Sequence, residues 1–106
     1  MDKIGIIVCE KTTKICGGCM CFSAFSKKEK SFERYKGKDV EIGAFFHCNG
    51  CNSELDKDLE EKVGIIKSKD IKNVHMALCI KVECKRYDEI KDYLVRNNFN
   101  VIEGTH

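Results

Sequence analysis

The sequence predicts an α/β domain in which a parallel β-sheet carries helices on both faces. Two observations predict this class: short apolar runs recur along the chain, and most segments between them show helical periodicity. A third observation, the length of 106 residues, fits one domain spanning 1–106 with a substantial hydrophobic core, and excludes two ordinary domains.

Each expected strand is a short apolar run. A continuous run of this kind is typical of a strand that is covered on both faces, as the strands of a parallel sheet are. The first run ends at Cys9 and the third at Cys79, so we expect both cysteines at strand ends. The four runs are Ile4–Val8, Val40–Phe46, Val74–Leu78 and Phe99–Ile102.

The expected helices lie between these runs. Apolar residues recur at helical spacing over residues 55–66 and again over 87–94, and each set predicts one helix. Ser53, followed by Glu54 and Asp56, is a typical start for the first of them. Four aromatic residues over 22–35 share a face and predict an earlier helix, although the stretch 26–31 between them is wholly polar.

Three strand–helix units followed by a last strand favour right-handed crossovers and a flavodoxin-like, doubly wound sheet of order 2-1-3-4. In such a sheet the carboxyl ends of all strands open onto one edge, where these folds bind ligands. We therefore expect any functional site at that edge.

Composition narrows the classes of function. The 36 charged side chains give a net charge of only +2, which provides no electrostatic support for nucleic-acid binding. No apolar run approaches the roughly 20 residues of a membrane-spanning helix, and the start lacks the apolar region of a secretory signal. We therefore expect a cytoplasmic protein. A reducing compartment disfavours structural disulfides and favours metal or redox use of the eight cysteines.

The cysteines are the main functional signal. Cys9 or Cys79 alone is more typical of a core residue than of a ligand. Taken together, however, the cysteines fall at strand ends or in connections at the one expected ligand-binding edge, and His106 follows the last strand. The set comprises Cys9, Cys16, Cys19, Cys21, Cys48, Cys51, Cys79 and Cys84.

Several thiolates in one place repel one another unless a cation neutralises them, as Zn²⁺ or an iron–sulfur cluster does. Two Cys-x-x-Cys pairs, Cys16–Cys19 and Cys48–Cys51, have the spacing that lets two sulfurs reach one metal. The strand order would place four cysteines closest together, namely Cys9, Cys48, Cys51 and Cys79. The remaining candidates would then bind a second ion or belong to a larger cluster, namely Cys16, Cys21, Cys84 and His106.

The two remaining histidines are interpreted differently. His75 precedes Cys79 by four residues, about 13 Å in an extended chain, and cannot easily share its metal. We interpret it as a structural histidine with satisfied hydrogen bonds. His47, next to Cys48, is equally consistent with an exposed loop residue and with a ligand.

The chain resembles the CGGC-domain family, small prokaryotic proteins regarded as metal-binding, with zinc expected from their cysteines and histidines. Cys48-Asn-Gly-Cys51 resembles the motif that names the family, with one glycine replaced. Cys19 looks like an extra cysteine, and Lys85 stands where the family often has proline. The resemblance covers essentially the whole chain and is carried by Gly5–Cys9, Cys16-x4-Cys21-Phe22, Phe45–Cys51, His75–Ile80, Cys84 and Val101–His106.

The leading hypothesis is zinc binding, and the predicted ligands are Cys9, Cys16, Cys21, Cys48, Cys51, Cys79, Cys84 and His106. An iron–sulfur cluster is the alternative, because one tetrahedral zinc leaves at least four thiols unused. A second alternative is a thiol–disulfide redox enzyme using Cys16-Gly-Gly-Cys19 ahead of a helix. The chain has no proline and so lacks the cis-proline loop of a thioredoxin. No catalytic constellation is recognisable, so an enzyme is not the favoured interpretation.

Overall fold

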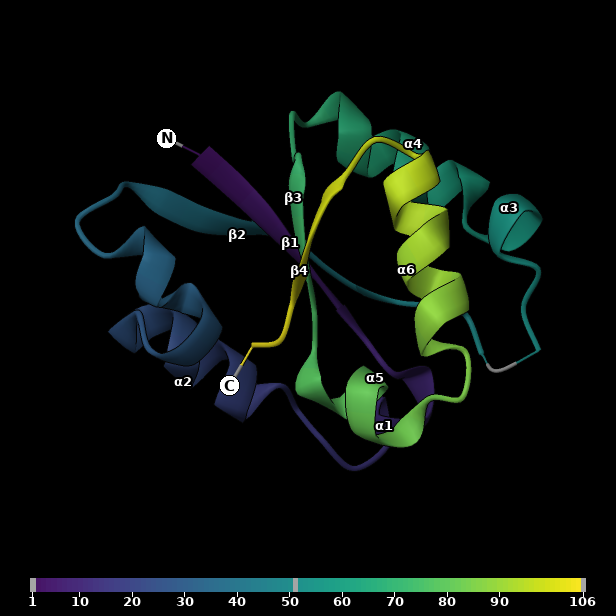
Figure 1. The fold of residues 1–106 in the computed structure, drawn as a ribbon, viewed down its shortest axis with the longest axis horizontal. Coiled ribbons are helices and arrows are strands. Elements are labelled where there is room, and N and C mark those ends of the chain that lie inside the picture. The colour runs from purple at the N-terminus through teal and green to yellow at the C-terminus, as the bar shows by residue number, and fades with distance from the viewer. Residues whose placement is uncertain (1, 51, 106) are drawn as a thin grey trace.

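The structure, a computed structural model, describes residues 2–50 and 52–105. Its four strands form one wholly parallel sheet of order β2-β1-β3-β4 (Figure 1), which confirms the predicted class and strand order. The strands are β1 (Asp2–Val8), β2 (Val40–His47), β3 (Asn73–Met76) and β4 (Asn100–Glu103).

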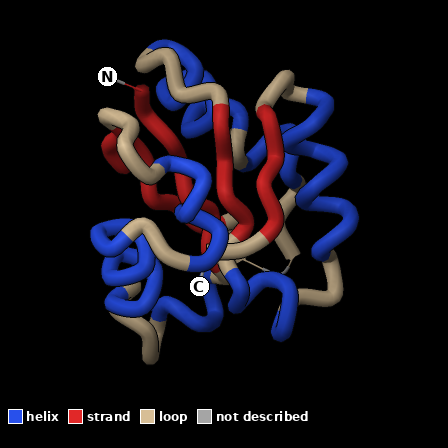
Figure 2. Tube along the Cα trace, turned by 60° about the vertical axis from the view of Figure 1, so that its left-hand side comes forward, coloured by secondary structure: helices blue, strands red, loops and turns tan. Residues whose placement is uncertain are grey.

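Helices cover both faces of the sheet (Figures 1 and 2). On one face lie α2 (Cys19–Lys27) and the 3-10 helix η1 (Lys30–Tyr35). On the other lie α3 (Leu55–Asp58), α4 (Glu60–Ser68) and α6 (Tyr87–Arg96). Two short helices, α1 (Glu10–Thr13) and α5 (Leu78–Glu83), follow β1 and β3 directly at the carboxyl edge.

The central strand β1 divides the interior into two hydrophobic cores. Because side chains alternate along a strand, Ile4, Ile6 and Val8 pack under α2 and η1, whereas Ile7 and Cys9 pack under α4 and α6. All five side chains are buried, which explains why this stretch of the sequence is a continuous apolar run.

The helix expected over 55–66 is two helices. Leu59, fully buried, separates α3 from α4 with φ −102° and ψ 0°. The side-chain amide of Asn49 donates a 3.0 Å hydrogen bond to the carbonyl of Asp58. A continuous helix would pair that carbonyl with the N–H of Lys62, so a contact from a distant loop replaces a helical one.

The third strand is shorter than expected, and the prediction for its end is wrong. It ends at Met76, not Leu78, and Cys79 lies in the first turn of α5. The chain turns at Ala77, whose carbonyl accepts a hydrogen bond from Ile80, while the N–H of Leu78 turns to the Thr105 hydroxyl. Cys79 nevertheless stays at the carboxyl edge of the sheet.

The helix expected over 22–35 is also divided, into α2 and η1. Lys28, between them, has φ +55°, and lies inside the polar stretch that interrupts the aromatic pattern. In the described part of the chain, no helix is long and apolar enough to cross a bilayer.

Candidate metal centre

Four cysteines line one small cavity at the carboxyl edge of the sheet. The cavity has a volume of about 40 Å³, and its cysteines are Cys9, Cys16, Cys21 and Cys79. A space of roughly 10–15 Å³ on this measure admits one water molecule, so the cavity has room for an ion. Its other walls are Val8, Thr12, Thr13, Gly18 and Phe45.

The fold brings these cysteines together from distant parts of the chain. Cys9 follows β1 directly, and Cys79 lies just beyond β3. Because β1 and β3 pair in parallel, with Ile7 beside Met76, their carboxyl ends are neighbours. The α1–α2 connection returns to the same edge and supplies Cys16, and the first turn of α2 supplies Cys21.

Hydrogen-bonding groups already point at three of the four sulfurs. The backbone N–H of Cys9 donates to Cys79 Sγ at 3.4 Å, and that of Gly18 donates to Cys16 Sγ at 3.4 Å. The Cys21 thiol donates to the Thr105 hydroxyl oxygen at 3.4 Å. The two backbone N–H donors stabilise a sulfur that carries negative charge, whether it is free or bound to a metal.

Two thiols of the cavity have raised pKa values, so without a cation they stay protonated at neutral pH. Burial raises the pKa of Cys21, and the neighbouring Cys16 raises it further. Burial likewise raises the pKa of Cys79, with Cys9 and Cys21 adding to the effect. A metal ion would reverse this balance, since it replaces the protons and neutralises the thiolates.

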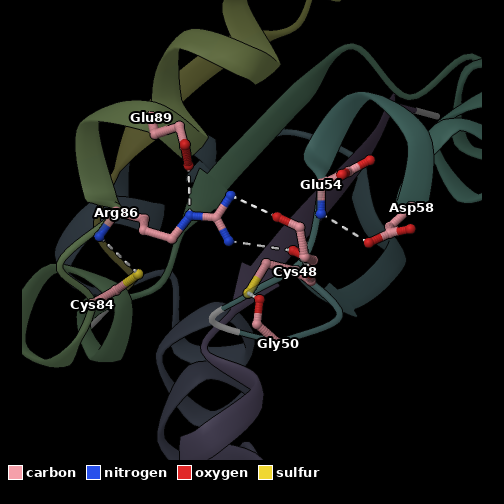
Figure 3. Close-up of polar contacts among 8 residues, drawn as sticks. Cys48, Gly50, Glu54, Asp58, Cys84, Arg86 and Glu89 are labelled. Carbon is pink, nitrogen blue, oxygen red and sulfur yellow. Dashed lines mark hydrogen bonds and ion pairs between the residues drawn. The ribbon is translucent and has the colours of Figure 1, made fainter.

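Two further cysteines lie around Arg86 rather than at the cavity (Figure 3). The guanidinium of Arg86 donates to the carbonyl oxygen of Ser53 at 2.8 Å, and the Ser53 hydroxyl donates to the carbonyl of Cys48 at 2.6 Å. The backbone N–H of Arg86 donates to Cys84 Sγ at 3.4 Å. Glu89 is the main cause that raises the pKa of Arg86, and Cys48 and Cys84 contribute. In this second group the two cysteines therefore lie near a guanidinium that is already paired with a carboxylate.

The predicted ligands that the structure describes line the cavity or lie around Arg86. Cys9, Cys16, Cys21 and Cys79 line the cavity, whereas Cys48 does not line it but packs in the same hydrophobic cluster as Cys9. Cys51 and His106 lie outside the described residues. Among the residues that are described, no three His, Cys, Asp or Glu side chains are close enough to hold one metal ion in their present rotamers. Cys19 is exposed and is not among the residues lining the cavity.

His75 is a structural histidine, as predicted. It is completely buried, its Nδ1–H donates to the carbonyl of Gly104 at 3.0 Å, and its Nε2 accepts from the Tyr35 hydroxyl at 2.7 Å. His47 is half-buried, and its Nδ1 accepts the backbone N–H of Asn49 at 3.1 Å. That bond fixes the turn after β2.

The sequence analysis missed Thr105. This residue is completely buried, and its hydroxyl oxygen lies 3.4 Å from Cys21 Sγ and accepts the N–H of Leu78 at 3.5 Å. It therefore connects the segment after β4 with two of the cysteine-bearing helices. Its place in the sequence could have indicated a role at the site, because a residue just after a parallel strand lies at the ligand-binding edge of the sheet.

Comparison with known proteins shows the family of the chain. The family model described as "CGGC domain" matches residues 3–106. The chain belongs to the CGGC domain family. This CGGC domain is 34% identical to the "Uncharacterized protein MJ0582" of Methanocaldococcus jannaschii over 115 aligned positions, which cover 98% of this chain and 86% of the relative. No solved structure matches the chain.

Proposed function

We propose that this CGGC domain binds a single thiophilic metal ion, zinc, in the cavity lined by Cys9, Cys16, Cys21 and Cys79. The observation that carries the proposal is the cavity itself, with four thiols on its wall and backbone N–H donors directed at two of the sulfurs. Zinc fits this donor set because it favours thiolate ligands in a tetrahedral arrangement.

Binding would require small side-chain movements rather than refolding. Zn–S bonds of about 2.3 Å need the four sulfurs to converge, and rotation about the Cα–Cβ bonds of cysteines on one cavity wall can supply this. Four protein thiolates also fill the coordination shell of zinc, which is typical of a structural or storage site and leaves no open position for catalysis.

The second group, Cys48 and Cys84 beside Arg86, has a different character. Its cation is a guanidinium that also pairs with Glu89, and its two cysteines do not line the four-cysteine cavity. With Cys51 it remains a candidate for a second ion. His106, predicted from the sequence alone, stays a proposed ligand.

An iron–sulfur cluster is the competing occupant. Its support is the number of cysteines, eight in 106 residues, which exceeds the needs of one zinc ion. The cavity volume of about 40 Å³ argues for a single ion, because a four-iron cluster adds eight atoms to be enclosed. Anaerobically purified protein should be colourless and hold stoichiometric zinc. Brown protein with acid-labile sulfide would establish the cluster instead.

Single substitutions test the ligand set. We expect Cys21→Ser and Cys79→Ser to weaken zinc affinity by more than about 100-fold. Removal of a residue that only hydrogen-bonds to a metal ligand costs up to about 100-fold, and removal of a ligand itself should cost more. The matched control is Cys48→Ser, since Cys48 is as buried as Cys21 (5% and 4% exposed) but lies outside the cavity. Affinity is measured by competition with a chelator. If Cys48→Ser empties the site while Cys21→Ser holds zinc, the group around Arg86 is the true centre.

A further inference from the structure

We propose that Cys16 and Cys19 form a capture port through which the ion enters the cavity, with Cys19 as a transient ligand and Cys16 as the ligand shared by port and cavity. This inference rests on the proposed function, because it concerns how the same cavity is loaded. It gives a role to Cys19, which does not line the cavity of the proposed zinc site.

Exposure distinguishes Cys16 from the other cavity ligands. Cys9 and Cys21 are buried and Cys79 is half-buried, whereas Cys16 is exposed to solvent and also lines the cavity. An ion that arrives from solvent therefore meets Cys16 before it meets the other three sulfurs. The sulfur of Cys16 already has a backbone donor, the N–H of Gly18.

Cys19 begins α2, three residues after Cys16, and its sulfur lies close to Gly17 on the loop that carries Cys16. A Cβ atom placed on Gly17, the residue next to Cys16, would be 3.9 Å from Cys19 Sγ. The Cys-x-x-Cys spacing allows both sulfurs to reach one ion. Cys19 is exposed and absent from the cavity wall, so it can hold an ion outside the cavity but not inside it.

Gly18 and two aromatic rings fix the shape of the port. Gly18 is buried with φ +82°, and a Cβ there would approach Phe45 Cζ to 3.0 Å and Phe22 Cε2 to 3.2 Å. The rings of Phe22 and Phe45 stack with centroids 5.0 Å apart. Because Phe45 also lines the cavity, this pair joins the glycine loop to the cavity wall, and Cys16 is the exposed cysteine of that wall.

The transfer is a ligand exchange without electron transfer. Cys16 and Cys19 each release a proton to water when they bind Zn²⁺, and the ligands of the incoming ion leave. A cavity thiol such as Cys21 then loses its proton and replaces Cys19, which takes a proton back from solvent. The ion keeps its charge throughout, and no oxidant or reductant is involved.

The test compares the rate of loading with the affinity at equilibrium. Full-length, metal-free protein is mixed under anaerobic conditions with zinc bound to a coloured chelator, and the release of chelator is followed over time. We expect Cys19→Ser to load about tenfold more slowly than the unsubstituted protein while its equilibrium affinity stays within about twofold. Cys19→His, which retains a zinc ligand, should recover much of the rate.

The control is Ser23→Ala, an exposed substitution on α2 that should change neither rate nor affinity. An unchanged loading rate in Cys19→Ser overturns the capture port. Loss of equilibrium affinity in that variant also overturns it, because Cys19 would then be a resident ligand. If the unsubstituted protein itself takes up no zinc, the proposed function fails, and this result is separate from either outcome for Cys19.

Discussion

At the scale of single residues, His75 shows how the interior decides a protonation state. The ring is completely buried, packs 4.6 Å from the ring of Phe32, and bonds through both nitrogens to Tyr35 and Gly104. Burial is the largest cause that lowers its pKa, to about 4, and the charge of Arg34 on η1 lowers it further. The ring is therefore neutral in the folded protein at neutral pH.

This predicts a pH-dependent stability. The unfolded chain binds a proton on His75 below about pH 6.5, whereas the folded protein resists it down to about pH 4. The free energy of unfolding should therefore be highest above this window and fall by up to about 3 kcal/mol as the pH decreases through it. Urea denaturation between pH 4 and 7 measures the effect.

The control for this prediction is His75→Gln, which removes the titrating group. The variant should be less stable at neutral pH, and it should lose most of the decrease between pH 6.5 and pH 4. An equal decrease in both proteins would show that carboxylates, not His75, are responsible.

At the scale of elements, Arg86 joins the loop after β2 to the start of α6. Its guanidinium donates to both the carbonyl and the hydroxyl of Ser53, at 2.8 and 3.5 Å, and pairs with Glu89 on the first turn of α6. Its side chain is 22% exposed, so these bonds are partly shielded from water. The segment that contains Cys48 is thereby tied to a helix almost 40 residues later in the sequence.

We expect Arg86→Gln to loosen this segment. The free energy of unfolding should fall by about 1–2 kcal/mol, because partly buried acceptors at Ser53 lose a charged donor. Amide hydrogen exchange should rise over residues 48–55. The matched control is Arg96→Gln, whose ion pair with Asp56 is largely exposed and should contribute little. Equal effects of the two substitutions would contradict this role of Arg86.

The elements also show what the sequence could predict. The four strands and their order followed from apolar runs, since burial on both faces leaves a strong signal in strands such as β1. The helices α1 and α5, with four and six residues, are too short for periodicity to reveal them. The division of the helix at Leu59 depends on Asn49, a contact between residues distant in sequence that no local pattern encodes.

The candidate site was predictable to a similar degree. Parallel strands imply a common edge, and Cys9, Cys48 and Cys79, among the described residues, follow the carboxyl ends of their strands. Which cysteines share a cavity depends on the path of the α1–α2 connection, which no periodic pattern describes. That path brings Cys16 and Cys21 to Cys9. Cys48, directly after β2, packs in the same cluster as Cys9 and lies near Arg86.

At the scale of the whole molecule, the two hydrophobic cores stand on opposite faces of the sheet and do not require an ion. One contains Phe32 and Tyr35, and the other contains Leu59, Tyr93 and Leu94, all buried. The four-cysteine cavity lies at the edge of these cores. A metal ion bound there, as proposed, would therefore add to a fold that is already formed, unlike the ion of a zinc finger.

We accordingly predict that the fold survives removal of the metal. A strong chelator should leave the far-ultraviolet circular dichroism nearly unchanged, while amide exchange rises over residues 9–21 and 77–84. The melting temperature should decrease by an amount that depends on zinc concentration, as expected for a ligand that binds only the folded state. Complete loss of helix on chelation would show that the cores are insufficient.

The position of β1 at the centre of the sheet also has a consequence for synthesis. The ribosome produces β1 first, with Cys9, Cys16 and Cys21 close behind, but Cys79 follows Cys9 by 70 residues. At translation rates of about 5–20 residues per second, roughly 4–14 seconds pass between the synthesis of Cys9 and that of Cys79. A nascent chain therefore exposes an incomplete cluster of thiols, and the four-cysteine cavity can be loaded only after translation has passed β3.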